Sequence, residues 1–496
     1  MRNQVQLITY VDRLGGGGLK ELRALLAGPL GGLFGGVHLL PFFEPIDGAD
    51  AGFDPVDHAA VDARLGTWSD VRALASELEL MGDLIVNHVS RDSPQFRDYA
   101  LHGAESRYAG MFLTLDAVFP AGATERELVA IHRPRPGLPV TPVTVGGDER
   151  RLLWTTFTPQ QVDIDVEHPE GRAYLESILD VFAANGVRMA RLDAVGYAIK
   201  KAGTRCFMIP ETFAFIDRLT GLAHRRGIEI LAEVHSHYRD QIELAKQVDR
   251  VYDFALPPLV LHAFAYRTAA RLAEWIAIRP TNALNVLDTH DGIGIVDIGA
   301  DAADRAARPG LVPDAELDYL VESIHERSQG ESRRATGAAA SNLDLYQVNC
   351  TYYDALGRDD REYLVARALQ CFLPGIPQIY YVGLLAGSND LELLAATGAG
   401  RDINRHRYAR GEVEAALERP VVRDLMRLIR LRNSHPAFAG TFDFRPLGED
   451  GLHLAWTRAA ERAELTVSFG HATLELWLDG RDGTRRVEFE CFAGDA

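Results

Sequence analysis

The stretch Val187-Arg-Met-Ala-Arg-Leu-Asp193 is a short apolar run that leads into a polar loop and then into an amphipathic segment with helical spacing. The same succession of run, loop and helical segment occurs at seven other places along the chain. Strands that alternate with helices in this way indicate a parallel sheet, and eight of them predict a closed (β/α)8 barrel. The other predicted strands are Val5–Tyr10, Val37–Pro41, Asp83–His88, Glu229–His235, Val251–Leu256, Asn285–Asp291 and Ile376–Val382.

Two of the connections between these predicted strands are too long for a single helix, and a segment of this size rarely stays structureless in a compact domain. The expected fold is therefore an α/β (β/α)8 TIM barrel with two inserted subdomains. Short alternating runs near the C-terminus add a β-domain, with strands at Leu452–Thr457, Glu464–Phe469, Thr473–Leu478 and Arg486–Cys491. The predicted division is barrel at 1–86, 168–292 and 358–437, inserted subdomain B at 87–167, second insert at 293–357 and C-terminal β-domain at 438–496.

The composition limits the partners that this chain can have. A formal net charge of −18 argues against nucleic acid, which requires a basic surface. No apolar run reaches the length of a membrane span, and the first residues lack the apolar core of a signal peptide. The four cysteines are far apart, as expected for free thiols in a reducing compartment. We therefore expect a cytoplasmic protein without nucleic-acid or membrane partners.

Polar side chains gather where the predicted strands end, which is the face of such a barrel that carries the active site. These side chains are Asn87, His88, Arg191, Asp193, Glu233, His235, His290 and Asp291. Burying three carboxylates without partners would be costly, so their position indicates function. Glycosidic bond chemistry needs one ionised carboxylate, one protonated carboxyl group and a third to steady positive charge. Arg191 would hold Asp193 ionised, which leaves the proton to Glu233.

Four segments in order resemble the motifs of the α-amylase superfamily, glycoside hydrolase family 13. They are Asp83-Leu-Ile-Val-Asn-His88, Arg191-Leu-Asp-Ala-Val195, Glu233-Val-His-Ser236 and Asp288-Thr-His-Asp291, and Gln161-Val-Asp-Ile-Asp165 resembles a fifth. The resemblance implies that Asp193 is the nucleophile, Glu233 the acid/base and Asp291 the transition-state stabiliser.

Other segments resemble the sucrose phosphorylase branch of that superfamily. They are Gln6-Leu-Ile-Thr-Tyr10, Asp47-Gly-Ala-Asp-Ala-Gly-Phe-Asp54, Arg133-Pro-Arg-Pro-Gly-Leu-Pro139, Arg191-Leu-Asp-Ala-Val-Gly-Tyr197, Leu343-Asp-Leu-Tyr-Gln347 and Gly400-Arg-Asp-Ile-Asn-Arg405. This resemblance implies reversible transfer of a glucosyl unit from sucrose to phosphate by retaining double displacement, in a homodimer.

The same resemblance assigns the remaining site residues. Asp50, Phe53, His88, Arg191, His290 and Arg401 would hold the glucosyl unit, and Phe157, Tyr197 and His235 would shape the site. Asp344 and Gln347 would face the fructose, whereas Arg135, Leu343 and Tyr346 would serve the phosphate. Phosphate must enter a pocket with three carboxylates in an acidic protein, so Arg133 and Arg135 are expected to offset the local field.

No cofactor and no metal ion are expected. The acidic loop Asp47–Asp57 lacks the ligand positions of an EF-hand, which makes calcium binding there the minor alternative. Gly15–Gly18 lacks the pattern of a phosphate-binding loop.

Three other functions stay open from the sequence. One is a sucrose hydrolase on the same barrel, and a second is a non-catalytic binding protein with a degenerate fold. The third is a related phosphorylase that acts on glucosylglycerol, glucosylglycerate or sucrose 6′-phosphate. His132 stands where the branch has Tyr, and Glu44 stands where it has Thr or a similar residue. Val140 stands where the branch has an aromatic residue. These departures lie near the acceptor side and bear on the third alternative.

Overall fold

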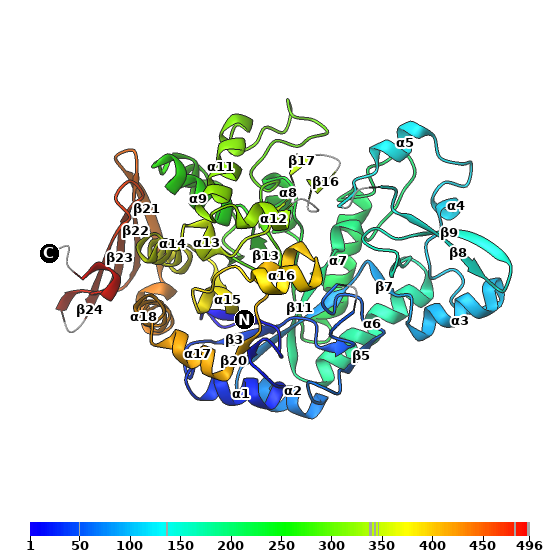
Figure 1. Cartoon of the computed structure of the whole chain (residues 1–496), viewed down its shortest axis with the longest axis horizontal. Helices are drawn as coiled ribbons and strands as arrows, with labels where there is room; N and C mark the ends of the chain where they lie inside the picture. The colour runs from blue at the N-terminus through cyan, green and yellow to red at the C-terminus, as the bar shows by residue number, and fades with distance from the viewer. Residues whose placement is uncertain are drawn as a thin grey trace.

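The computed structural model is a closed parallel β-barrel surrounded by helices, with a small antiparallel sheet at one end of the molecule (Figure 1). It describes all residues except 49, 135–136, 337–339, 342–343, 346, 481–482 and 494–496, and of 340–341 and 344–345 only the backbone. The barrel strands in the described part of the chain are, in order around the barrel, β1 (Gln6–Thr9), β19 (Ile376–Tyr380), β14 (Ala283–Asn285), β13 (Arg250–Asp253), β12 (Glu229–Ala232), β11 (Val187–Asp193), β6 (Glu79–Ile85) and β3 (Gly36–Leu39). The predicted (β/α)8 fold is confirmed.

Several barrel strands end earlier than the sequence predicts. β12 stops at Ala232 and β14 at Asn285, so Glu233, His290 and Asp291 lie in the loops that follow. Each strand pairs with its neighbours only while its backbone runs parallel to theirs. At the mouth of the barrel the chain turns away, which presents these polar side chains to the opening.

The helices cover the outside of the barrel with apolar faces. In α18 (Pro420–Ser434), Val421, Leu425 and Ile429 recur every four residues and are buried. Prolines occupy the first turns of several of these helices, where no backbone hydrogen bond is lost. The other helices that follow barrel strands are α1 (Leu19–Ala27), α2 (Trp68–Ala75), α6 (Pro169–Ala184), α7 (Pro210–His224), α8 (Tyr238–Leu244), α9 (Leu256–Tyr266), α10 (Ala270–Ile278) and α14 (Asp360–Phe372).

The register of neighbouring strands brings the first two predicted catalytic residues to one edge. Arg191 of β11 pairs in register with Asp83 of β6, and Leu192 pairs with Ala232 of β12. Side chains alternate along a strand, so Arg191 and Asp193 point to the same side of β11. Glu233 directly follows Ala232, so it lies at the same mouth of the barrel as Asp193.

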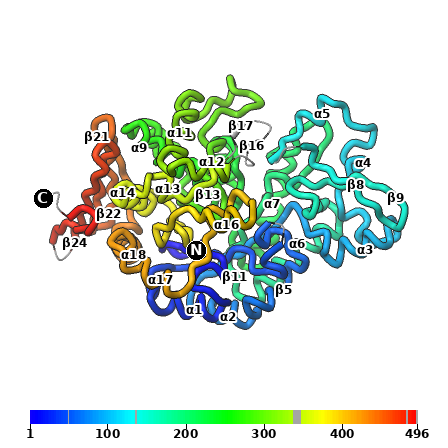
Figure 2. The backbone as a smooth tube through the Cα atoms, in the orientation of Figure 1, coloured from blue at the N-terminus to red at the C-terminus, as the bar shows by residue number. Residues whose placement is uncertain are grey.

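Two long segments interrupt the alternation of strands and helices. The first projects from the barrel on the side away from the C-terminal sheet (Figure 1, Figure 2). It contains β7 (His88–Ser90), α3 (Pro94–His102), η1 (Gly103–Glu105), α4 (Leu115–Val118), α5 (Glu125–Ala130), β8 (Val140–Val145), β9 (Glu149–Trp154) and β10 (Gln161–Asp163). The second contains β15 (Ile293–Gly294), α11 (Asp314–Arg327), α12 (Glu331–Thr336), β16 (Ala340–Ser341), β17 (Asp344–Leu345), β18 (Gln347–Val348) and α13 (Tyr352–Ala355). The domain boundaries drawn from the sequence stay predictions.

The C-terminal β-domain is an antiparallel sheet with strand order β21 to β25. Its strands are β21 (Thr441–Leu447), β22 (Gly451–Arg458), β23 (Glu461–Ser468), β24 (Thr473–Gly480) and β25 (Gly483–Arg486). The sequence did not predict β21, and it placed the last strand at 486–491. The backbone N–H groups of Glu490 and Cys491 instead donate to the Asp424 carboxylate at 3.0 and 2.9 Å. These bonds to α18 turn the chain into η5 (Glu490–Phe492).

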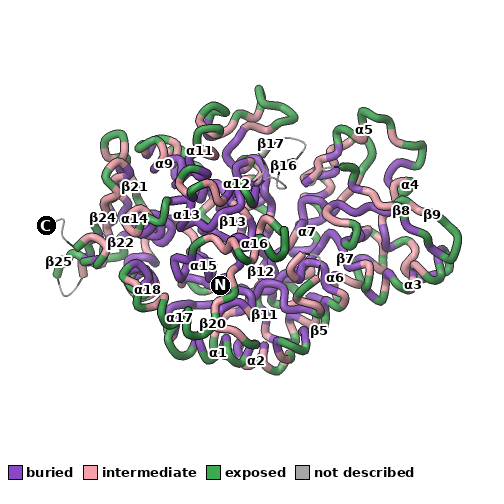
Figure 3. Tube along the Cα trace, in the orientation of Figure 1, coloured by how far each residue is buried: buried purple, intermediate pink, exposed green. Residues whose placement is uncertain are grey.

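Burial follows the barrel and its helices. Figure 3 shows buried residues along the barrel strands and exposed residues along the outer loops. Within the described residues, none of the helices has the length and apolar character needed to cross a membrane.

Candidate active site

A pocket opens at the carboxyl ends of the barrel strands and is lined by Asp193, Glu233 and Asp291 together. It encloses about 690 Å³ of space outside protein atoms, part of it open to solvent. We call it the carboxylate pocket. The predicted substrate-binding residues that line the same pocket are Asp50, Phe53, His88, Phe157, Tyr197, His235, His290 and Arg401.

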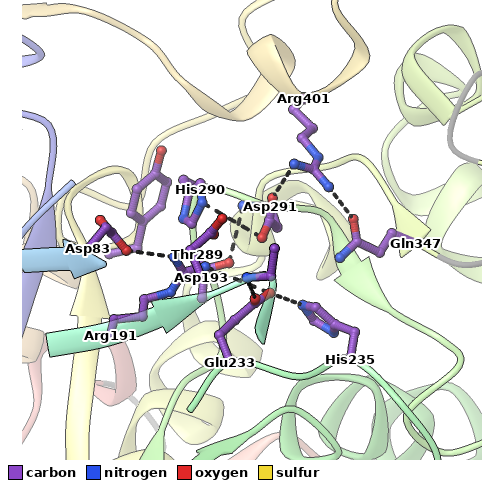
Figure 4. Close-up of polar contacts among 12 residues, drawn as sticks. Asp83, Arg191, Asp193, Glu233, His235, Thr289, His290, Asp291, Gln347 and Arg401 are labelled. Atoms are coloured by element: carbon purple, nitrogen blue, oxygen red, sulfur yellow. Dashed lines mark hydrogen bonds and ion pairs between the residues drawn. The ribbon is translucent and has the colours of Figure 1, made fainter. Parts of the chain in front are cut away.

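Arg191 joins carboxylates from two neighbouring strands (Figure 4). Its Nη1 donates to Asp83 Oδ1 at 2.6 Å and to Asp193 Oδ1 at 2.8 Å, and its Nη2 lies 3.7 Å from Glu233 Oε1. Burial alone would raise the pKa of Asp83, but the charges of His38 and Arg191 lower it to about 2. Asp83 is therefore a fixed anion that holds the guanidinium beside Asp193.

Asp193 and Glu233 both lie close to the positive charge of Arg191. Burial raises the pKa of Asp193 well above its usual value of 3.8, while Arg191 lowers it and the charge of Glu233 raises it again. Ionisation of Asp193 therefore depends on its contact with Arg191. Arg191 lies closer to Asp193 than to Glu233: its Nη1 is 2.8 Å from Asp193 Oδ1, and its Nη2 is 3.7 Å from Glu233 Oε1. Arg191 thus stabilises the anionic form of Asp193 through the shorter of these two contacts.

The backbone directly after Asp193 is strained. Ala194 has φ 55° and ψ 21°, a left-handed conformation that costs a residue with a Cβ atom about 1–3 kcal/mol. In this conformation its N–H donates to Glu233 Oε2 at 3.3 Å. The turn therefore fixes the position of Glu233 relative to Asp193.

Asp291 is held by an arginine from a loop more than a hundred residues later in the chain. Arg401, in η3 (Gly400–Asn404), places its Nη1 2.7 Å from Asp291 Oδ1. Burial would raise the pKa of Asp291, but the charges of Arg401 and His290 lower it well below its usual range. Arg401 Nη2 also donates to Gln347 Oε1 at 3.4 Å, which connects the second insert to the pocket (Figure 4). Asp291 is therefore ionised throughout the physiological pH range.

His235 is oriented by a buried carboxylate. Its Nδ1 lies 2.9 Å from Asp297 Oδ2, and its Nε2 lies 3.9 Å from Glu233 Oε1. Burial lowers the pKa of His235, but the charge and hydrogen bond of Asp297 raise it above its usual value overall. A Cβ atom on Gly294 would lie 2.1 Å from Asp297 Oδ2, so glycine is required for this close approach. The arrangement turns the second ring nitrogen of His235 toward Glu233.

Aromatic rings form the remaining wall of the carboxylate pocket. Phe53 stacks on His290 with ring centroids 4.8 Å apart and planes 7° apart. His88 Nε2 lies 2.9 Å from the carbonyl oxygen of Phe53, and burial lowers the pKa of His88. Phe157 packs edge-on against Tyr197 at 5.2 Å. A flat apolar surface beside carboxylates suits the apolar face of a sugar ring.

A metal site is the alternative use of this cluster. Glu233, His235 and Asp291 each offer one atom within 4.8 Å of the others. Asp291 is already paired with the guanidinium of Arg401 at 2.7 Å, and Arg191 lies 3.7 Å from Glu233. Two guanidinium groups at this distance repel a further cation. The cluster is better suited to proton transfer and charge stabilisation on a neutral substrate.

Comparison with known proteins agrees with this geometry. Residues 32–265 match the family described as Alpha amylase, catalytic domain. A sucrose phosphorylase from Agrobacterium vitis is 60% identical over 480 residues, which cover 97% of this chain and 98% of that protein. One from Bifidobacterium adolescentis is 54% identical over 495 residues, which cover 100% of this chain and 97% of that protein. The chain belongs to the sucrose phosphorylase family.

The fold of the sucrose phosphorylase family extends over the whole chain. The crystal structure of a sucrose 6F-phosphate phosphorylase from Thermoanaerobacter thermosaccharolyticum matches with a TM-score of 0.90 at 38% identity, over 99% of this chain and 98% of that one. Both resemblances drawn from the motifs, to the α-amylase superfamily and to its sucrose phosphorylase branch, are confirmed.

Sequence reasoning missed a lysine that ties the first insert of this sucrose phosphorylase family member to its pocket. Lys200 Nζ lies 2.6 Å from Asp163 Oδ2 and 2.5 Å from both Asn87 Oδ1 and the carbonyl oxygen of Tyr197. Its side chain is only 1% exposed. The chain has lysine only at 20, 200, 201 and 246. Lys200 therefore could have been singled out in the sequence, because it is a rare residue type three positions after the motif that ends at Tyr197.

Three further buried residues support the predicted ones without having been predicted themselves. Asp83 fixes Arg191, Asp297 fixes His235, and Arg405 Nε donates to the carbonyl oxygen of His290 at 3.0 Å. Asp83 and Arg405 stand inside quoted motifs and could have been found there. Asp297 carries no sequence signal, because only the folded chain brings it to His235.

The predicted phosphate residues Arg135, Leu343 and Tyr346 lie outside the described residues, and so does the side chain of Asp344. Their roles stay predictions. Two residues before Arg135, Nη1 of Arg133 donates to the carbonyl oxygen of Gly137 at 3.0 Å.

Proposed function

We propose that the protein catalyses the reversible phosphorolysis of sucrose to α-D-glucose 1-phosphate and D-fructose, as a glycosyltransferase of the disaccharide phosphorylase type. The observation that carries the proposal is the placement of Asp193, Glu233 and Asp291 in one pocket, with Arg191 bonded to Asp193. The identity of 60% and 54% to two proteins named sucrose phosphorylase, over nearly the full chain, supports this substrate.

In the first step, the glucosyl unit moves from sucrose to the enzyme. Asp193 forms a bond to the anomeric carbon while the bond from that carbon to the fructosyl oxygen breaks. Glu233 gives its proton to this oxygen, so fructose leaves as a neutral alcohol. Positive charge develops on the sugar ring in the transition state, and the ionised Asp291 stabilises it.

In the second step, a phosphate oxygen attacks the anomeric carbon from the side that fructose left. The bond to Asp193 breaks, and Glu233 takes back a proton from the phosphate. Two inversions give net retention, so the product is the α-anomer. Arg401 supplies positive charge near the attacking anion, and Arg135 is proposed to add to it.

The test is an incubation of the purified protein with sucrose, with and without inorganic phosphate, in which fructose, free glucose and glucose 1-phosphate are followed. The Asp193→Asn variant serves as the blank. We expect glucose 1-phosphate to form only with phosphate and only in the wild type. Free glucose in equal yield without phosphate would instead indicate a sucrose hydrolase.

A related phosphorylase with another acceptor is the second candidate, and His132 is the observation that favours it. His132 stacks on Phe207 at 4.3 Å, and Phe207 lines the carboxylate pocket. The matched sucrose 6F-phosphate phosphorylase shows that this fold serves a phosphorylated substrate in another protein. If sucrose is not turned over, glucosylglycerol, glucosylglycerate and sucrose 6′-phosphate are the substrates to assay next.

We also propose a cytoplasmic homodimer. The four cysteines are free thiols, three of them buried, which supports a reducing compartment. The dimer rests on the resemblance to the family. Sedimentation velocity of the purified chain tests it, and a single species with the mass of one chain would contradict it.

A further inference from the structure

Helix α14 buries a face that carries polar side chains. Tyr363, Arg367 and Gln370 follow one another at intervals of four and three residues, so they lie on one side of the helix, and all three are buried. Gln370 Nε2 donates to the carbonyl oxygens of Asn285, at the end of β14, and Gln378, in β19, at 2.9 and 2.8 Å. A buried polar group costs free energy unless it is hydrogen-bonded, so a buried arginine on this face indicates a specific contact.

That contact joins Arg367 to the first residue of the segment that ends in Asp291. Arg367 Nη2 lies 2.6 Å from Asp288 Oδ2, and neither side chain exposes more than 4% of its surface. Its Nε and Nη2 also donate to the Tyr363 hydroxyl oxygen at 3.0 and 2.7 Å, and its Nη1 donates to Gln370 Oε1 at 2.8 Å. Burial would lower the pKa of Arg367, but the charge of Asp288 raises it above its usual value. The guanidinium is therefore charged and fixed by its neighbours.

The close approach of Arg367 to Asp288 requires glycine at position 383. Gly383 lies in α15 (Tyr381–Leu384), which follows β19. A Cβ atom at this position would lie 1.9 Å from Asp288 Oδ2 and 2.0 Å from Arg367 Nη2, far inside van der Waals contact. The carbonyl oxygen of Gly383 also accepts the Tyr363 hydroxyl at 2.5 Å. The backbone of α15 therefore closes around the ion pair and leaves no space for a larger residue.

The three residues after Asp288 are anchored from another side, by side chains of η3 and of the residue that follows it. These anchors are Asn404 to the Thr289 carbonyl oxygen at 2.9 Å, Arg405 to the His290 carbonyl oxygen at 3.0 Å and Arg401 to the Asp291 carboxylate at 2.7 Å (Figure 4). The N–H group of Asp291 donates to Thr289 Oγ1 at 3.1 Å, so the path of the backbone after Asp288 decides where Asp291 lies. Arg367 is the anchor at the beginning of this path.

We propose that Arg367 is a positioning residue for Asp291, which it holds in place through Asp288 and the backbone that follows. The inference rests on the proposed glucosyl transfer, in which Asp291 stabilises positive charge on the sugar ring. A displacement of about 1 Å in a group of this kind can cost about 10²-fold in rate. Arg367 therefore affects the first step of the reaction although it does not line the carboxylate pocket.

A single added methyl group tests this role. Gly383→Ala forces Arg367 and Asp288 apart while it keeps both side chains. The initial rate of fluoride release from α-D-glucosyl fluoride, measured before the first turnover is complete, reports the first step alone. We expect Gly383→Ala to lower the maximal initial rate about tenfold or more and to leave the half-saturating donor concentration within about threefold. His290, which would hold the glucosyl unit, keeps its own anchor in Arg405, so binding changes less than the rate.

Two further variants accompany this substitution. Gly411→Ala is the matched control, because Gly411 is an exposed residue of α17 (Arg410–Leu417) and a Cβ atom there meets no atom within 4 Å. It should leave both values within about twofold. Arg367→Lys keeps the charge but loses the fork of hydrogen bonds, so it should lower the maximal initial rate about threefold or more. If Gly383→Ala fails to fold, Arg367→Lys decides the matter.

The effect should disappear when Asp291 has lost its charge, which a purely structural role would not predict. Added to Asp291→Asn, either Gly383→Ala or Arg367→Lys should lower the initial rate by no more than about twofold, because the group to be positioned is already absent. A full additional loss in the double variant would overturn the proposal, and so would a maximal rate equal to that of the wild type in the folded single variant.

The choice of donor separates this proposal from the proposed function. Release of fluoride requires neither fructose nor phosphate, so the comparison of variants holds for any leaving group and any acceptor. Absence of fluoride release from the wild type would overturn the proposal together with the proposed glucosyl transfer. Normal release from the wild type and an equal rate in Gly383→Ala would overturn the role of Arg367 alone.

Discussion

The carboxylate pocket and the adjacent pocket, a second pocket lined by His132 and Leu317 among others, share the side chains of Phe207 and His235. The carboxylates of the first pocket and the His132 ring of the second are held in opposite ways. In the carboxylate pocket, Asp193 bonds to Arg191 and Asp291 pairs with Arg401. In the adjacent pocket, the ring nitrogens of His132 have no partner among the described residues. Groups that must stabilise a transition state are fixed in advance, because reorganisation during the reaction would cost free energy.

The difference also concerns charge. Arg191 is buried and lies within 3.7 Å of three carboxylates. Removal of any one partner therefore leaves a charge of this cluster uncompensated. Substitutions in the carboxylate pocket should therefore have large effects on activity and stability, and apolar substitutions in the adjacent pocket should have small ones.

The largest effect is expected for the two residues that exchange bonds and protons with the substrate. Asp193→Asn should lower turnover of both sucrose and α-D-glucosyl fluoride by about 10⁴-fold or more, since both need the nucleophile. Glu233→Gln should lower turnover of sucrose by about 10²–10⁴-fold. It should spare the first step with glucosyl fluoride, because fluoride leaves without a proton. The initial burst of fluoride or fructose, measured without phosphate, reports the rate of this first step alone, and equal loss of the burst rate on both substrates in Glu233→Gln would show that Glu233 is not the acid.

Arg191→Met comes next. It leaves Asp83 and Asp193 buried without their cation, which should lower the free energy of unfolding by about 3–5 kcal/mol. Arg191 lowers the pKa of Asp193, so its removal raises that pKa further. The acidic limb of the profile of kcat/KM against pH should therefore move to higher pH.

The matched control for Arg191→Met is Arg97→Met, which removes an arginine from an exposed ion pair with Asp92. This change should alter neither the pH profile nor the unfolding midpoint appreciably. An unchanged acidic limb in Arg191→Met would contradict the assigned role of Arg191.

Asp297→Asn should have a smaller effect that depends on pH. Asp297 raises the pKa of His235 above its usual 6.5, although burial lowers it. A raised histidine pKa contributes stability that is fully present below about pH 6.5 and is lost as the pH rises through the folded-state value. The stability difference between wild type and Asp297→Asn should therefore be greatest in acid and shrink at higher pH. Urea unfolding at several pH values measures it, with the exposed Asp217→Asn as control, and a difference that grows with pH would contradict the pairing.

The smallest effect, and one of opposite sign, is expected for His132→Phe. The ring stays stacked between Phe207 and Tyr197, while two buried nitrogens without partners disappear. The free energy of unfolding should rise by about 1 kcal/mol. A lower urea midpoint would mean that His132 has a stabilising partner in the unbound protein, and the contrast between the two pockets would fail.

The sequence predicted the barrel because parallel strands buried on both faces leave apolar runs that are easily recognised. It predicted that Asp193, Glu233 and Asp291 lie together, because the barrel brings strand ends together and these residues stand inside motifs. The roles of these residues stay predictions until the variants are measured.

The sequence was less informative where distant parts of the chain decide the structure. β21 was missed because it carries Pro446 and mostly exposed side chains, which resemble a loop. The last strand was misplaced because the pattern around Val487 and Phe489 is strand-like, while Asp424 of α18 captures the following backbone. Asp297 could not be found for the same reason, since its contact with His235 exists only in the folded chain.

The most direct test of the central claim is the configuration of newly formed glucose 1-phosphate, followed by proton NMR from the start of the reaction with sucrose and phosphate. Double displacement at Asp193 predicts that the α-anomer forms at once and exclusively. Formation of the β-anomer would show a single displacement, and it would contradict both the covalent intermediate and the role of Asp193.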